Sequence, residues 1–133
     1  MDFMEKHNIK NLTGTLMYED TPLVDFDIVN ERLVYVREYD RINNYKYYPV
    51  EFRFDDAVNY GDINDYFKHN VVEDGAQDIY EYLKTLGLRY YDLDEIVKRN
   101  NGYNHLGLRW VRFRNFGAKT WHDIKTQYYP IYK

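Results

Sequence analysis

The chain has 133 residues, a common size for one domain, and its 44% apolar and 19% aromatic residues exclude a disordered polymer. It lacks cysteine, which excludes disulfides and thiolate metal sites, and no stretch approaches the ~20 apolar residues of a membrane-spanning helix. The net charge of −4 combines two unequal regions: residues 1–95 hold 21 of the 22 acids, and residues 96–133 hold eight of the 18 bases. We therefore expect one domain, residues 1–133, in the cytoplasm and without membrane contact.

Strands are predicted first along the chain. Leu12–Tyr18 and Leu23–Val29 are strand-like segments that flank the turn residues Glu19–Pro22, which indicates a hairpin. A third strand is predicted over Arg32–Tyr39 and a fourth over Tyr45–Phe54. The side chains that this fourth strand would place on one face are Tyr48, Val50, Phe52 and Phe54.

Helical periodicity replaces the alternation after Asp62. Apolar spacing predicts a helix around residues 63–67, a second over residues 79–86 that Gly87 ends, and a third that Asp92 caps. A last strand is expected over Leu106–Arg114, followed by a short turn that Thr120 caps. The order indicates an α+β fold, with a four-stranded antiparallel meander, about three helices on one face and a C-terminal strand.

Acids and tyrosines of the meander and the loop after it form the first candidate binding surface. Tyrosine is enriched where proteins recognise other proteins, and displayed carboxylates can imitate phosphates and occupy the basic nucleic-acid groove of a partner. The alternative is that the tyrosines fill the core and the acids keep the domain soluble. The expected partner-binding residues are Tyr47, Glu51, Asp55, Asp56, Asp62 and Asp65.

The segment Arg109–Phe116 interleaves arginines with aromatic residues, a pattern typical of nucleic-acid binding. The alternative is an amphipathic strand that buries Val111 and Phe113 while its arginines pair with acids of the sheet. Because the whole chain is acidic, direct nucleic-acid binding is the weaker interpretation. The candidate nucleic-acid contacts are Arg109, Arg112 and Arg114.

No residue set forms a catalytic signature. Serine and cysteine are absent, the four histidines are scattered, and no glycine-rich phosphate loop is present. We therefore expect no enzyme activity, no cofactor and no metal site. The acid pairs Asp25/Asp27 and Asp55/Asp56 leave a metal-dependent enzyme of unrecognised type as an alternative.

Four segments of the chain carry a resemblance to a known family: Leu16–Phe26, Asp78–Leu88, Trp110 and Thr120–Ile124. The first is similar to the opening hairpin of HipA-like toxin–antitoxin proteins, and the others resemble the rest of the leading, non-kinase part of those proteins. The resemblance implies an accessory domain, and no phosphate loop or catalytic residue carries over with it.

In character, the chain is also similar to the small proteins with which phages and mobile elements disable host defences, among them anti-CRISPR proteins. We therefore expect a non-catalytic inhibitor that binds a protein or nucleoprotein, such as a Cas nuclease, through its acidic, tyrosine-rich surface. A toxin–antitoxin accessory domain is the alternative, and the oligomeric state stays open.

Overall fold

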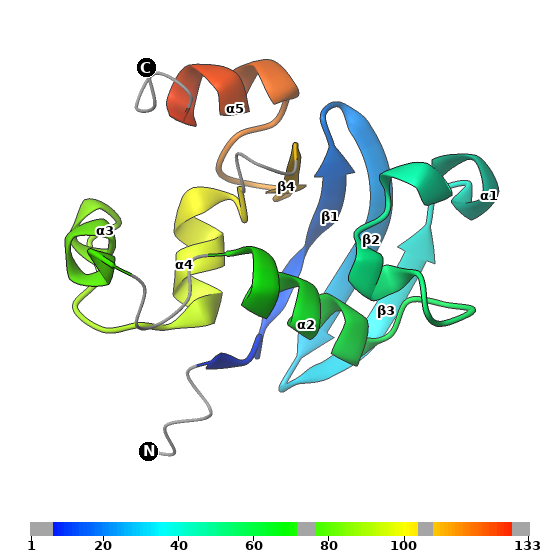
Figure 1. Cartoon of the computed structure of the whole chain (residues 1–133), viewed down its shortest axis with the longest axis horizontal. Coiled ribbons are helices and arrows are strands. Elements are labelled where there is room, and N and C mark those ends of the chain that lie inside the picture. Colours follow the sequence, from blue (N-terminus) through cyan, green and yellow to red (C-terminus); the bar gives the residue numbers. More distant parts are fainter. Residues whose placement is uncertain (1–6, 72–76, 104–107, 129–133) are drawn as a thin grey trace.

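The computed structural model describes residues 7–71, 77–103 and 108–128. The fold is α+β, as predicted, with a four-stranded antiparallel sheet in the order β3-β2-β1-β4 (Figure 1). The strands are β1 (Leu12–Tyr18), β2 (Thr21–Val29), β3 (Arg32–Glu38) and β4 (Arg109–Arg112). The helices are α1 (Arg41–Asn44), α2 (Tyr60–Asn70), α3 (Ile79–Thr85), α4 (Leu93–Asn100) and α5 (Trp121–Tyr128), with the 3-10 turns η2 (Tyr45–Tyr47) and η3 (Val50–Phe52). None of the helices in these ranges is long and apolar enough to cross a bilayer.

The first three strands follow the sequence pattern closely. The bounds of β1 are those predicted, and two-residue turns join β1 to β2 and β2 to β3. Asn30 and Glu31 form the second turn with φ of 50° and 63°. Two consecutive positive φ values match the twist of the flanking strands, so this turn makes a tight hairpin.

The fourth strand predicted over Tyr45–Phe54 is wrong, because this segment forms short helical turns. Asp40 caps α1 by accepting a hydrogen bond from the backbone N–H of Asn43. In the following turns Tyr48 and Phe52 are buried, four residues apart, while Val50 and Phe54 are exposed. A helical spacing therefore selects the buried residues, and the fourth strand of the sheet is β4.

Helices cover both faces of the sheet. On one face, a core built on strand residues such as Leu16 and Phe26 includes residues of α2, α3 and α4. On the other face, Met17 and Trp110 pack with Trp121 and Ile124 of α5. Figure 1 shows α2 lying across the sheet and α5 near the end where β1 meets β4. The expectation of helices on one face therefore holds for α2 to α4, and α5 differs.

Strand β4 is shorter than predicted, and residues 106–107 of the expected strand lie outside the described residues. It pairs antiparallel with β1, placing Val111 opposite Leu16. A Cβ atom at Gly14 would lie 2.7 Å from Cγ1 of Val111 and 3.2 Å from the carbonyl oxygen of Arg112. Gly14 therefore permits the close approach of the two strands.

Helix ends confirm three predicted capping residues and add one capping motif that was not predicted from the sequence. Asp92 caps α4 and Gly87, at φ 76°, follows the end of α3, as the sequence indicates. The predicted Thr120 cap is present, because its hydroxyl accepts a hydrogen bond from the backbone of Asp123. The unpredicted cap is a capping box at the start of α2, made by Asn59 and Asp62.

Candidate protein-binding surface

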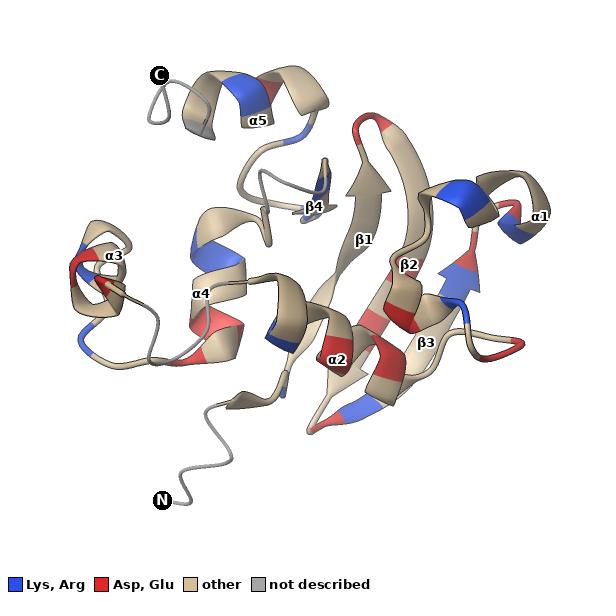
Figure 2. Cartoon of the chain, viewed as in Figure 1, with Lys and Arg blue, Asp and Glu red and all other residues tan. Residues whose placement is uncertain are grey.

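The segment from the end of β3 to the middle of α2 carries most of the features expected of a binding surface. We call residues 38–65 the acidic platform. It contains seven carboxylates and three basic side chains. Figure 2 shows acidic residues on α2 and in the loop before it. All six sequence-predicted partner contacts lie within this platform.

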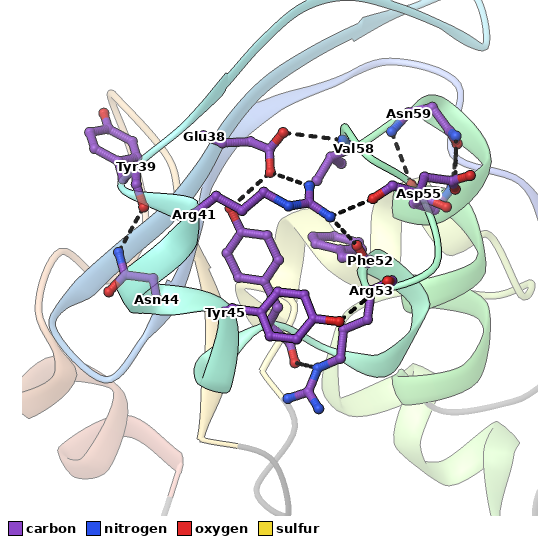
Figure 3. A network of polar contacts seen from close by, with 12 residues as sticks. Glu38, Tyr39, Arg41, Asn44, Tyr45, Phe52, Arg53, Asp55, Val58 and Asn59 are labelled. Carbon is purple, nitrogen blue, oxygen red and sulfur yellow. Dashed lines mark hydrogen bonds and ion pairs between the residues drawn. The ribbon is translucent and has the colours of Figure 1, made fainter.

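Arg41 holds the irregular backbone of the platform together (Figure 3). Its guanidinium donates to Glu38 at 2.6 Å and to the carbonyl oxygens of Phe52, at 3.2 Å, and Asp55. Glu38 also accepts hydrogen bonds from the Tyr48 hydroxyl and the Val58 backbone. Arg41 thus joins Glu38, at the end of β3, to η3 and to the loop before α2. Its guanidinium also provides hydrogen-bond donors for carbonyl groups that no strand or helix pairs.

Arg53 makes a second set of contacts in the platform. Its guanidinium donates to the carbonyl oxygens of Tyr48, at 3.1 Å, and Lys46, at 3.2 Å, and lies 5.4 Å from the centre of the Tyr45 ring. The Tyr45 hydroxyl donates to the Arg53 carbonyl at 3.4 Å. Two of the three platform bases therefore bind its own backbone, which leaves the charge of exposed carboxylates unneutralised.

Large apolar side chains are exposed on this fixed backbone. Ile42 is 90% exposed and Phe54 82%, with Val50 at 57% and Tyr45 at 41%. Exposing apolar surface forgoes the free energy that burial provides, roughly 25 cal/mol per Å². Sequence reasoning missed Ile42 and placed Val50 and Phe54 on one face with Tyr48 and Phe52. The available signal was the i, i+4 spacing of Tyr48 and Phe52 around Pro49.

The six predicted contact residues divide by exposure. Asp55, Asp56 and Asp65 are exposed. Glu51 is half-buried, with its carboxylate 3.1 Å from Nδ1 of His69. Tyr47 is also half-buried, and its ring stacks on Tyr18 with centroids 4.5 Å apart. The sixth residue, Asp62, is buried.

Asp62 has a structural function and an altered acidity. Its carboxylate accepts a hydrogen bond from the backbone of Asn59 at the start of α2. Burial, followed by a hydrogen bond with the Asp55 carboxyl, raises the pKa of Asp62 to about 6. The structure thus brings the carboxyl groups of Asp55 and Asp62 together.

The three candidate nucleic-acid contacts lie in two different environments. Arg109 donates to the carbonyl oxygen of Tyr47 at 2.9 Å and to that of Tyr48 at 3.3 Å, so it fastens η2 to β4. Arg112 and Arg114 instead line a hollow on the sheet face that α5 covers only at one end. We call this face the open face. Val111 and Phe113 are buried, as the amphipathic-strand interpretation requires.

The ion pairs of the described residues are local. They join Arg41 to Glu38, His69 to Glu51, Lys84 to Glu81 and Arg99 to Glu95. Among these described pairs, Arg99–Glu95 is the one that joins the basic region to the acidic one, and it lies within a single helix. Across residues 7–71, 77–103 and 108–128, no arginine of β4 and no basic side chain after it forms an ion pair with a platform carboxylate.

Within the described residues, no three histidine or carboxylate side chains converge to hold a metal ion. Asp25 and Asp27 share the open face of the sheet, where each accepts a hydrogen bond from a threonine hydroxyl of β1.

Comparisons with known protein families, with curated proteins and with solved structures found no match to this chain.

Proposed function

We propose that this protein is a non-catalytic binding module whose acidic platform docks on a basic, nucleic-acid-binding groove of a partner protein. One observation carries the proposal: Ile42 and Phe54 are almost fully exposed on backbone that the Arg41 contacts hold in place. Exposed apolar side chains on ordered backbone, surrounded by charged residues, resemble the apolar centre and polar rim of protein interfaces.

The charge of the platform supports a basic partner. Carboxylates at Asp55, Asp56 and Asp65 are exposed, and the platform arginines bind backbone carbonyls rather than these acids. Such a surface attracts a positively charged groove and imitates the phosphates that the groove binds. The proposed activity is therefore inhibition of a host defence nucleoprotein, with a Cas nuclease as the proposed target.

The test measures inhibition of target-DNA binding. Cas nucleases loaded with guide RNA are titrated with the full chain at low and high ionic strength. We expect inhibition of at least one nuclease, weaker at high ionic strength because salt screens the charges. Phe54→Ala should weaken it about tenfold or more, since truncation of a central interface residue typically has this effect. The absence of inhibition across the panel contradicts the Cas target.

Matched variants separate the platform from general surface effects. Tyr80→Ala removes an aromatic side chain of α3 that is 74% exposed and lies outside the platform, so inhibition should persist. Asp55→Asn with Asp56→Asn should slow association, whereas Glu81→Gln on α3 should not. Equal inhibition by the Phe54→Ala and Tyr80→Ala variants would show that the platform is not the contact surface.

Identification of the partner uses the same pair of variants. The chain is immobilised and exposed to lysate of its source cell, with Phe54→Ala and Tyr80→Ala as parallel baits. The proposed partner is a nucleic-acid-binding protein that is captured by the chain and by Tyr80→Ala and lost with Phe54→Ala. Capture of that protein by all three baits contradicts the proposal.

A further inference from the structure

The open face of the sheet holds a second candidate site, separate from the acidic platform. Helix α5 covers this face where Met17 and Trp110 lie. Beyond that end the face carries a hollow of about 480 Å³. Sites for small organic ligands commonly have volumes of ~300–1,000 Å³, so the hollow is large enough for one.

Two rows of polar side chains cross this face. The strand register places Arg112 of β4 opposite Thr15, Thr15 opposite Asp25, and Asp25 opposite Arg37 of β3. Strands in a sheet are ~4.8 Å apart, so the backbones at Asp25 and Arg112 are separated by about 10 Å. The second row consists of Thr13, Asp27 and Tyr35.

Hydroxyl groups hold both carboxylates in place. Thr15 and Tyr39 donate hydrogen bonds to Asp25, and Thr13 donates to Asp27 at 2.6 Å. The hydrogen bond to Asp25, followed by burial, raises the pKa of Tyr39. A carboxylate accepts about four hydrogen bonds, so each acid keeps unused acceptor sites at the hollow. Incoming N–H donors therefore meet preorganised acceptors.

Cationic groups flank the carboxylates. Arg112 and Arg114 line the hollow, and within the described residues neither forms an ion pair with an acid. Arg37 lies 4.7 Å from the centre of the Tyr39 ring. Planar guanidinium groups without a carboxylate partner are suited to bind phosphate oxygens.

This charge arrangement restricts the ligand. The central carboxylates repel a simple anion and the arginines repel a simple cation, so the ligand needs an anionic group and N–H donors. A nucleotide meets both requirements, because it joins an anionic phosphate to a base that carries N–H donors. The aromatic rings of Tyr35, which is 53% exposed, and Tyr39 offer surfaces for a planar base.

We propose that the open sheet face binds a nucleotide unit, with its phosphate at Arg112 and Arg114 and its base at Asp27 and Tyr35. Guanine fits best, because its N1–H and its exocyclic amino group present two adjacent donors to one carboxylate. Uracil offers a single imino donor, and its carbonyl oxygens face the acid unfavourably. The shared unit occurs in free nucleotides and in single-stranded RNA.

Isothermal titration calorimetry on the full chain tests the assignment. The probes are GMP, UMP, guanosine, inorganic phosphate and the hexanucleotide UUGUUU. We expect GMP to bind more tightly than UMP, guanosine or phosphate alone. Asp27→Asn and Arg112→Gln should each weaken GMP binding about tenfold or more, because each removes a charged hydrogen-bonding group. Arg32→Gln, outside the hollow, should bind GMP like the parent chain.

The outcomes separate clearly. Tighter binding of UUGUUU than of GMP identifies an RNA strand as the source of the nucleotide, and similar affinities identify the free nucleotide. Equal binding of GMP and UMP, binding of phosphate that Asp27→Asn leaves unchanged, or no binding of any probe overturns the proposal. Thermal melting of each variant shows whether it is folded. Thr13→Val is a second variant that leaves the charge unchanged and removes the hydroxyl that donates to Asp27. The acidic platform plays no part in this result.

Discussion

The acidic platform and the open sheet face both present charged side chains. Their backbone N–H and C=O groups, however, find hydrogen-bond partners in different ways. On the sheet face, β2 and its neighbouring strands pair their backbone groups, so Thr15 and Asp25 are free to bond with each other. In the platform, the backbone is irregular, and Arg41 and Arg53 donate to its carbonyls. The platform uses its cations for structure, whereas the sheet face keeps Arg112 available.

This difference explains why the two surfaces suit different partners. A regular strand ladder places polar groups at fixed spacings, which favours a small ligand with several hydrogen-bonding groups. The platform exposes the apolar side chains of Ile42 and Phe54. Its exposed carboxylates are not neutralised by the platform arginines, because these donate to backbone carbonyls. That combination favours a macromolecule that supplies both apolar and basic surface.

Arg41→Ala should have the largest effect on stability, because Arg41 contacts backbone carbonyls of the platform. The substitution removes an ion pair and two hydrogen bonds to carbonyls, and it should lower the free energy of unfolding by about 2–3 kcal/mol. Urea denaturation measures the loss. Arg32→Ala is the control, because Arg32 is exposed and should change stability by less than about 0.5 kcal/mol. Equal effects would show that Arg41 does not support the platform.

Gly14→Ala tests the sheet side. The added methyl group would meet Val111 and the backbone of Arg112, so β1 and β4 must separate slightly. We expect a loss of about 1–3 kcal/mol, typical of overpacking. Gly61→Ala in α2 meets only a side-chain atom, at 3.3 Å, and should change stability by less than about 1 kcal/mol. A neutral Gly14→Ala variant would mean that the strands tolerate a wider spacing.

Thr15→Val tests the contribution of one hydroxyl group on the sheet face. The variant keeps the shape of the side chain and removes a donor to Asp25, while the Tyr39 donor remains. We expect a loss of about 1 kcal/mol in the free energy of unfolding by chemical denaturation. Thr126→Val in α5 is the control, since its hydroxyl bonds to the backbone of its own helix. A gain in stability would contradict a preorganised carboxylate.

The last effect is a pH dependence that follows from the acidity of Asp62. Its pKa of about 6 exceeds the unfolded value of 3.8, so the folded protein binds this proton more tightly. This contribution to stability is complete below the unfolded pKa and is lost as pH rises from about 4 to 6. Relative to the parent chain, Asp62→Asn should therefore become more stable as pH rises through this range, as measured by urea denaturation.

A second variant tests the cause of that shift. Asp55→Asn removes the neighbouring acid that helps to raise the pKa of Asp62, so the pH-dependent window should move to lower pH. If the difference between Asp62→Asn and the parent chain is independent of pH, the folded and unfolded pKa values of Asp62 are the same.

The sequence predicted the sheet well where local chemistry decides the structure. Alternation and turn residues gave β1 to β3 almost to the residue. The prediction of a strand over Tyr45–Phe54 was wrong, because aromatic and branched residues at every second position from Tyr48 to Phe54 also fit a strand. The deciding contacts come from Arg41, whose carbonyl partners lie 11 and 14 residues away in sequence. Local patterns contain no information about such contacts.

The candidate site was predictable only in part for the same reason. Of the six predicted contact residues, Asp55, Asp56 and Asp65 are exposed, and their function in binding stays a prediction. The exposure of Ile42 and Phe54 depends on the turns that replace the expected strand. The open-face site required the register that places Arg112 and Asp25 in one row, and pairing between distant strands is not visible in a sequence window.

The pairing of β1 with β4 also sets an order in which the chain folds. The indole of Trp110 donates to the carbonyl oxygen of Glu19, a contact that spans 91 residues. Closing so long a loop costs entropy before any contact forms, whereas the β1–β2–β3 hairpins need only short loops. During synthesis, β1 must therefore wait for the C-terminal segment to leave the ribosome before the sheet is complete.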